Sequence, residues 1–144
     1  MMTWLRKAIG LVRGNEKPEH LKLGEAGEEA ASNYLKSIGY KILGRRVKFK
    51  GRYELDIVAR DGDVLVFVEV KTRTGELFGR PIDSIKKAKI KSLTKAAWEY
   101  IRRLSNKQIY YRFDVVEVIG DDPVVHAEIR HIKDAFKSAR RHYF

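Results

Sequence analysis

Residues 54–71 read ELDIVARDGDVLVFVEVK, and this stretch decides the fold. Two runs rich in Val, Ile, Leu and Phe flank Asp61-Gly62, a pattern that predicts a β-hairpin closed by a two-residue turn. With Asp61 and Gly62 at the centre of the turn, Arg60 pairs with Asp63. Directly opposite residues share a face and successive residues alternate between faces, so this register determines which side chains the hairpin brings together.

The register predicts one apolar face and one mixed face. The apolar face consists of Leu55, Ile57, Ala59, Val64, Val66, Val68 and Val70. The mixed face combines carboxylates and an ammonium group with apolar side chains: Glu54, Asp56, Val58, Leu65, Phe67, Glu69 and Lys71. A charge near an apolar core is costly unless it is paired or binds an ion, so the mixed face needs an explanation.

The acidic residues of the mixed face predict a cation site. Asp56 lies opposite Phe67 in this register, which makes Asp56 and Glu69 diagonal neighbours on adjacent strands, about 7–8 Å apart at the backbone. Their side chains can converge on a hard cation such as Mg²⁺, which binds carboxylate oxygens and water. Lys71 points to the same side as Glu69. A three-residue turn would instead place Asp56 and Glu69 on opposite faces.

A second interpretation of the same acids is an edge hairpin whose outer face is solvated and carries salt bridges. The apolar neighbours Leu65 and Phe67 argue against a fully solvated face. The order of the residues also argues against it, because one acid is followed, after a gap, by Glu-x-Lys.

That order resembles the PD-(D/E)xK nuclease superfamily, with Asp56 as the first acid and Glu69-Val70-Lys71 as the Glu-x-Lys. The flanking residues are similar, more narrowly, to the YraN-type family of small bacterial endonuclease-like proteins, over residues 23–136. The segments that carry this resemblance are Gly27-Glu28 with Ala31, Tyr34 and Leu35, Gly39-Tyr40, Ile42-Leu43, Glu54-Leu55-Asp56, Phe67-Val68-Glu69-Val70-Lys71-Thr72-Arg73, Arg112-Phe113-Asp114-Val115-Val116 and Ala135-Phe136. Two positions depart from the family, which usually has Gly in place of Tyr53 and Asn in place of Arg46.

The resemblance implies an α/β fold, a three-layer restriction-endonuclease-like sandwich with a central mixed β-sheet flanked by helices. It also implies that Glu28, Asp56 and Glu69 bind Mg²⁺ or Mn²⁺, and that Lys71 orients the attacking water or neutralises developing charge. The nearest functional relatives of the family resemble archaeal Holliday-junction resolvases. They imply DNA as the partner, in particular branched or junction DNA, and a homodimer, because a resolvase cuts two strands symmetrically.

The composition is that of one basic domain. The chain has 144 residues, 44% of them hydrophobic, which is enough for a single core. We expect residues 1–20 to form a basic N-terminal extension and linker, and residues 21–144 to form the endonuclease-like domain. The formal net charge of +11 points to a polyanionic partner, nucleic acid first and an anionic membrane second.

Other features exclude several classes of protein. The absence of Cys excludes disulfides and Cys-based metal sites. No apolar run reaches the roughly 18 residues that a membrane span needs, and the start of the chain lacks the pattern of a signal peptide, so we expect a cytoplasmic protein. No Gly-rich phosphate loop or nucleophile elbow is present, so no small-molecule cofactor is expected. The His residues show no paired metal-binding spacing.

The remaining chain predicts further helices and strands around the hairpin. Apolar periodicity and turn residues predict a helix over residues 24–38, a strand over 40–49, a helix over 84–104, strands over 109–119 and 124–129, and a C-terminal helix with Ile132, Ala135, Phe136 and Ala139 on its apolar face. The first two helices are expected to cover the two faces of the sheet.

Basic residues close to the acidic hairpin in sequence predict a nucleic-acid-binding surface. They lie in the loop before the hairpin, in the loop after it, and at a spacing of four along the second helix: Lys48, Lys50 and Arg52, then Arg73 and Arg80, then Lys87, Lys91 and Lys95. The alternative is an ordinary solvated loop and a helix face that is charged for solubility.

Three functions are open on the sequence alone. The first is a metal-dependent nuclease that acts on DNA. The second is a nucleic-acid-binding module that has the same fold but does not cut. Loss of an acid or of the lysine would indicate the second function, and none is lost here. The third is a basic adaptor that binds a protein or a membrane through an amphipathic helix within residues 1–14.

Overall fold

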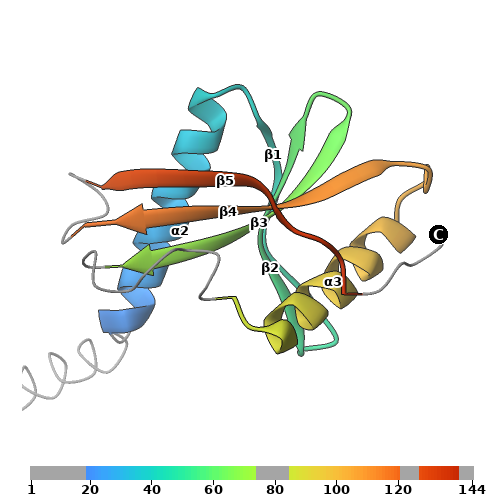
Figure 1. The fold of residues 1–144 in the computed structure, drawn as a ribbon, viewed down its shortest axis with the longest axis horizontal. Helices are drawn as coiled ribbons and strands as arrows, with labels where there is room; N and C mark the ends of the chain where they lie inside the picture. Colours follow the sequence, from blue (N-terminus) through green and yellow to red (C-terminus); the bar gives the residue numbers. More distant parts are fainter. Residues whose placement is uncertain (1–18, 74–84, 121–126, 140–144) are drawn as a thin grey trace, which may run out of the picture.

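The structure, a computed structural model, describes residues 19–73, 85–120 and 127–139. Its elements in chain order are α2 (Glu19–Ser37), β1 (Lys41–Phe49), β2 (Tyr53–Asp61), β3 (Val64–Arg73), α3 (Lys87–Arg102), β4 (Tyr110–Ile119) and β5 (Glu128–Phe136), as drawn in Figure 1. Most of the predicted N-terminal extension and Arg80 lie outside the described residues.

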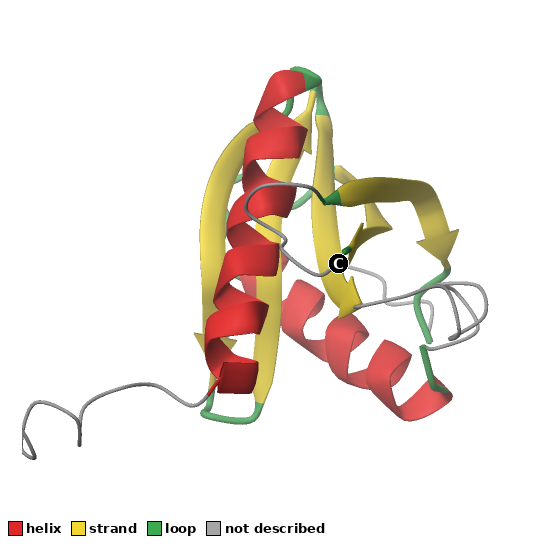
Figure 2. Cartoon of the chain, turned by 90° about the vertical axis from the view of Figure 1, so that its left-hand side faces the viewer, coloured by secondary structure: helices red, strands yellow, loops and turns green. Residues whose placement is uncertain are grey.

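The strands form one mixed sheet in the order β1-β2-β3-β4-β5. Neighbouring strands are antiparallel except β3 and β4, which are parallel and have α3 between them in the chain. Alternate residues of β3 point to different helices, since Val66 and Val68 pack with α2 whereas Leu65 and Phe67 pack with α3. The two helices therefore cover opposite faces; they are well separated in Figure 1 and run in different directions in Figure 2. The predicted α/β fold with a central mixed sheet is confirmed.

α2 packs on one face of the sheet through Ala31 and Leu35, both fully buried. The helix begins earlier than predicted, at Glu19. It ends before Gly39, whose φ of +92° lies in the left-handed region that glycine adopts without strain. No described helix has the length and the apolar character that crossing a membrane requires.

α3 packs on the other face through Leu93, Ala97 and Ile101, which share one side of the helix. The turn between β1 and β2 lies beside this helix (Figure 1). Phe49, the last residue of β1, belongs to the same core and has the Arg103 guanidinium 4.6 Å from the centre of its ring. α3 therefore anchors the β1–β2 hairpin as well as the centre of the sheet.

The β2–β3 hairpin differs from the prediction in its register. Arg60 pairs with Leu65 instead of Asp63, a shift of two residues, so the central turn residues are Gly62-Asp63. Gly62 has a φ of +58° at the first central position, where type II′ turns have Gly. Because side chains alternate with a period of two, a shift of two leaves the faces as predicted.

Leu55 is the exception to the predicted faces. It was placed with Ile57, but in the structure it packs with Val58 and α3. Within the described residues, the pairing of β2 with β3 ends at Ile57 and Val68, and earlier residues of β2 pair with β1, as Leu55 does with Val47. Released from β3, this end of β2 turns toward α3 (Figure 1).

The C-terminal part corrects the predicted helix, because β5 continues as a strand to Phe136; of the predicted strand over 124–129, residues 128 and 129 begin β5 and residues 124–126 lie outside the described residues. Ile132 pairs with Val115 and Phe136 pairs with Phe113, and the register shifts between these pairs. Asp134, between them in the chain, has a φ of +51°, as expected in a bulge. The bulge adds residues between the buried positions of the strand. The apolar residues therefore recur every three or four positions, as they do in a helix, instead of every second position.

A buried polar network joins α2, β4 and β5. Asp114 is fully buried and accepts hydrogen bonds from Arg112 Nε (2.9 Å), His131 Nε2 (2.8 Å) and the Asp134 amide (3.0 Å). On its other side, His131 Nδ1 accepts a hydrogen bond of 3.2 Å from the Tyr34 hydroxyl. Burial raises the pKa of Asp114, but the hydrogen bonds from His131 and Arg112 outweigh it and hold the pKa below its ordinary value. Ionised Asp114 therefore stabilises the bulge and its contact with α2.

We expect Asp114→Asn to lower the free energy of unfolding by about 3 kcal/mol or more, because it removes one charge from a buried, hydrogen-bonded group. Asp61→Asn is the matched control, since Asp61 also pairs with Arg112 (3.0 Å) but is 40% exposed. Ion pairs at such positions contribute up to about 1 kcal/mol. Urea unfolding at pH 7 measures both variants. Equal losses would contradict the dominant role of the buried partner.

Candidate functional site

Three carboxylates from α2 and β2 come together beside the sheet. One oxygen each of Glu28, Glu54 and Asp56 lies within 4.8 Å of the other two. Glu28 and Asp56 were predicted as metal ligands, and Glu54 was placed on the mixed face of the hairpin. We call these three residues the acidic cluster.

Gly27 allows α2 to approach the sheet closely enough to bring Glu28 to this position. A Cβ atom at Gly27 would lie 2.0 Å from Thr72 Oγ1 and 3.1 Å from Thr72 Cβ, so a larger residue would displace the helix or the strand. Thr72 directly follows Lys71 on β3. The contact therefore fixes α2 against the part of β3 that carries Glu69 and Lys71.

Asp56 and Glu69 come close to each other just beyond the last β2–β3 pair, Ile57 and Val68. Asp56 Oδ2 accepts a hydrogen bond of 2.9 Å from the Val70 amide. Burial, followed by the charge of Glu69, raises the pKa of Asp56 to about 7, and the Val70 bond and Lys89 offset this only in part.

Glu69 has one oxygen near two cations and one oxygen without a partner. Its Oε1 lies 3.7 Å from Lys71 Nζ and 3.5 Å from Lys89 Nζ. Its Oε2 is buried and has no hydrogen-bond partner within the described residues. Leaving such an acceptor without a partner is costly, so this oxygen is suited to a cation.

The donor set fits a hard divalent cation. The acidic cluster and Glu69 Oε2 offer only carboxylate oxygens, which Mg²⁺ and Mn²⁺ prefer. A cation would also remove the repulsion that raises the pKa of Asp56. The predicted set of Glu28, Asp56 and Glu69 is therefore chemically suitable, and Glu54 adds a fourth carboxylate.

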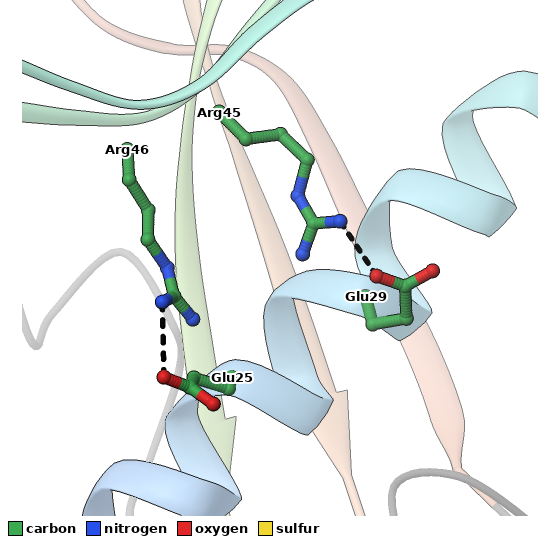
Figure 3. A pocket seen from close by; sticks show the side chains of 4 residues that line it. All are labelled: Glu25, Glu29, Arg45 and Arg46. Carbon is green, nitrogen blue, oxygen red and sulfur yellow. Dashed lines mark hydrogen bonds and ion pairs between the residues drawn. The ribbon is translucent and has the colours of Figure 1, made fainter.

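Glu28 already has a cationic partner in the protein. Arg46 Nε lies 2.5 Å from Glu28 and its Nη1 lies 3.1 Å from Glu25, while Arg45 pairs with Glu29 at 2.6 Å. Figure 3 shows both arginines reaching from β1 toward α2, where they line a pocket of about 360 Å³ with Glu25 and Glu29. The hydrogen bonds to Glu28 and Glu25 raise the pKa of Arg46. Arg46 therefore ties α2 to β1 and partly neutralises the acidic cluster.

Most of the predicted nucleic-acid-binding residues are exposed. They come from the β1–β2 turn and from α3, and we call them the basic face: Lys48, Lys50, Arg52, Lys87, Lys91 and Lys95. The two segments adjoin, because Lys95 Nζ lies 5.6 Å from the centre of the Tyr53 ring and Lys50 Nζ lies 3.6 Å from Glu99. A continuous basic surface across two elements is suited to a phosphate backbone.

Arg73 differs from the other predicted residues. Its side chain is 14% exposed and forms an ion pair of 2.6 Å with the buried Glu117 of β4. This contact joins the ends of two parallel strands and makes Arg73 less accessible than the residues of the basic face.

Lys89 is the residue of the site that sequence reasoning missed. The spacing of Lys87, Lys91 and Lys95 drew attention to one row of α3, whereas Lys89 lies about 200° around the helix axis from Lys87. The sequence did indicate that a further cation was needed, because Lys71 alone cannot compensate the negative charge of the carboxylates on the mixed face. That imbalance predicts a cation from another element, although it does not identify which one.

The comparisons with known proteins agree on one family. The family model for "Uncharacterised protein family UPF0102" matches residues 27–118. A UPF0102 protein of Symbiobacterium thermophilum is 47% identical over 97 residues, which cover 67% of this chain and 81% of the relative. UPF0102 proteins of Geotalea daltonii and Bacteroides thetaiotaomicron are 41% and 45% identical over 128 and 118 residues, covering 89% and 82% of this chain and 99% and 94% of the relatives.

Asp56→Asn is expected to stabilise the protein at neutral and alkaline pH in EDTA. The pKa of Asp56 is raised from 3.8 to about 7, so the stability that its proton provides is complete below pH 3.8 and is lost as the pH rises through 7. The variant avoids this loss and keeps an oxygen for the Val70 amide. The difference in the free energy of unfolding between the variant and wild type should grow between pH 4 and 7, to at most about 4 kcal/mol in favour of the variant, and then remain constant.

Thermal unfolding across this pH range, with and without Mg²⁺, measures the effect. Mg²⁺ should raise the melting temperature of wild type above pH 7 and have little effect on the variant. Asp63→Asn, at an exposed position of the β2–β3 turn, controls for the loss of one negative charge. A variant that melts well below wild type in EDTA would identify Asp56 as a structural ion-pair partner instead.

Proposed function

Because the chain belongs to the uncharacterised protein family UPF0102, the YraN-type family of PD-(D/E)xK nuclease-like proteins, we propose that it is a metal-dependent nuclease that acts on DNA. The observation that carries the proposal is the acidic cluster next to Glu69 and Lys71. Several carboxylates at a partly buried position, one of them with a pKa near 7, are expected at a site that binds a cation or performs acid–base chemistry.

Each residue has a distinct role in this proposal. Glu28, Asp56 and Glu69 would hold Mg²⁺ or Mn²⁺, and Glu54 would contribute a further oxygen or bind a coordinated water. When bound, the metal ion would lower the pKa of a water and stabilise the negative charge that develops on the phosphate. Lys71 and Lys89, both close to Glu69, would orient the water and bind phosphate oxygens.

Charge supports nucleic acid as the substrate. The chain has a net charge of +11, and α3 supplies Lys87, Lys91 and Lys95 of the basic face as well as Lys89 beside Glu69. Branched or junction DNA and a homodimeric assembly are proposed from the resemblance of the family to archaeal Holliday-junction resolvases.

A second candidate is a nucleic-acid-binding module that does not cleave. The observation in its favour is that the protein itself supplies cations to two of the three proposed ligands. Arg46 pairs with Glu28, and Lys71 and Lys89 pair with Glu69. In this alternative the charges form a structural network and no metal ion is needed.

Cleavage assays separate the two candidates. Purified protein should cut labelled DNA in Mg²⁺ or Mn²⁺ and not in EDTA, and a panel of linear, flapped and four-way substrates would identify the preferred structure. Asp56→Asn should abolish cleavage while DNA binding remains equal or becomes tighter, because one charge that repels phosphate is removed. Asp63→Asn should cleave as wild type does. Metal-dependent cleavage that survives Asp56→Asn would contradict the proposed site.

DNA binding should be mainly electrostatic. The logarithm of the affinity is expected to fall linearly with the logarithm of the salt concentration, with a slope near −0.9 per phosphate contacted. Lys91→Gln, on the basic face, should reduce that slope by about 1. Lys36→Gln removes the same charge from an exposed position on α2, on the opposite face of the sheet, and should change the slope little. Equal effects of both variants would show that net charge, and not the basic face, governs binding.

A further inference from the structure

A second concave site lies on the other side of Glu69 from the acidic cluster, at the start of α3. It is a pocket of about 460 Å³ lined by Lys71, Lys86, Ala88, Lys89 and Ser92. Among the described residues, Glu69 forms ion pairs with two of its lysines through Oε1, and the charge of Lys89 also acts on Asp56. The roles proposed above use Lys71 and Lys89 and leave Lys86 and Ser92 unexplained.

The charge of this pocket favours an anion. Lys71, Lys86 and Lys89 line the pocket, and Glu69 Oε1 pairs with Lys71 and Lys89, so the lining remains positive when Glu69 is ionised. If a cation bound the free Oε2 of Glu69, the lysines would share a carboxylate that is already partly neutralised, and the pocket would become more positive. An anion in the pocket and a cation at the acidic cluster would therefore each favour the other.

The backbone at the start of α3 also favours an anion. The first turn of α3 contains no acidic residue, and the side chain of its N-cap residue, Lys86, makes no capping hydrogen bond. The partial positive charge at the start of this helix is thus not compensated by its own side chains. The Ser92 hydroxyl adds a neutral donor one turn further along, which can fix the orientation of a bound oxyanion.

We infer that this pocket binds one phosphate group of the nucleic acid, next to the phosphate that reacts at the acidic cluster; the identity of the nucleic acid rests on the proposed function. The lysines and Ser92 supply charge-assisted and neutral donors for a tetrahedral oxyanion, and none of the described residues that line the pocket is aromatic and able to stack on a base. Two sources of this phosphate exist, an internal phosphodiester and a terminal phosphate monoester. The pocket differs from the basic face, whose lysines are exposed along the helix.

Inorganic phosphate is the first probe, added in EDTA to the full chain while backbone amide signals are followed by NMR. We expect the largest shifts at Lys86, Ala88, Lys89 and Ser92. Lys86→Gln should weaken phosphate binding about tenfold, because it removes one charged donor. Ser92→Ala should weaken it less, and Lys91→Gln, which removes a lysine of the basic face, should leave it nearly unchanged. Both pocket variants keep the contacts of Lys71 and Lys89 with Glu69.

Short DNA strands with a 5′-phosphate, a 3′-phosphate or neither then distinguish the two sources. If Lys86→Gln weakens binding only of strands phosphorylated at one end, the pocket takes a terminal monoester. If it weakens all strands equally, and clearly more than Lys91→Gln does, the pocket takes an internal diester. Amide shifts spread over the exposed lysines, or a Lys86→Gln effect no larger than that of Lys91→Gln, would overturn the inference.

The test is independent of cleavage because all binding is measured in EDTA. If the protein binds phosphate at Lys86 but does not cut DNA, the phosphate pocket is supported and the proposed nuclease function is contradicted. If the protein cuts DNA but does not bind phosphate at Lys86, the nuclease function is supported and the phosphate pocket is contradicted.

Discussion

Asp56 and Glu69 lie close together at the end of the β2–β3 hairpin, and much of the surrounding structure serves to hold them there. Partial burial, followed by the charge of Glu69, disfavours the ionised form of Asp56 and raises its pKa to about 7. The Val70 amide, Lys71 and Lys89 reduce the cost without removing it, and Glu69 Oε2 has no partner within the described residues. A fold that tolerates such a pair has a position ready for a cation.

The two helices contribute opposite charges to this pair. α2 brings Glu28 next to Asp56, and the absence of a side chain at Gly27 permits its approach to β3. α3 brings Lys89 to Glu69 from the other face of the sheet. The site thus has an acidic side and a basic side, with Glu69 between them. Such a separation of charge suits the binding of a metal ion next to an anionic phosphate. The carboxylates can hold the metal ion and the lysines can hold the phosphate, without the two sets neutralising each other.

The parts of this arrangement that depend on strand period could be predicted from the sequence, and those that depend on register or tertiary contact could not. Asp61-Gly62 and Gly62-Asp63 are both plausible turn centres, so the hairpin register was wrong by two residues, yet residues 57–68 kept their predicted faces because the period is two. β5 was taken for a helix because the bulge at Asp134 alters its spacing. The contact of Lys89 with Glu69 could not be predicted, because the apolar pattern of a helix does not indicate which strand each of its sides faces.

The acidic residues differ in how readily each could bind a cation, because each has different partners in the protein. Glu28 is held by Arg46, which itself adopts a φ of +50° at a cost of about 1–2 kcal/mol, so this ion pair helps to stabilise a strained backbone. Glu54 is 41% exposed and only 3.9 Å from Lys48, so its charge is weakly bound and well solvated. Asp56 is the acid of the cluster whose ionised form gains least from the protein, since only one amide donates to it among the contacts described. A metal ion would therefore gain most from Asp56, whereas a purely structural network would have little reason to keep an acid there.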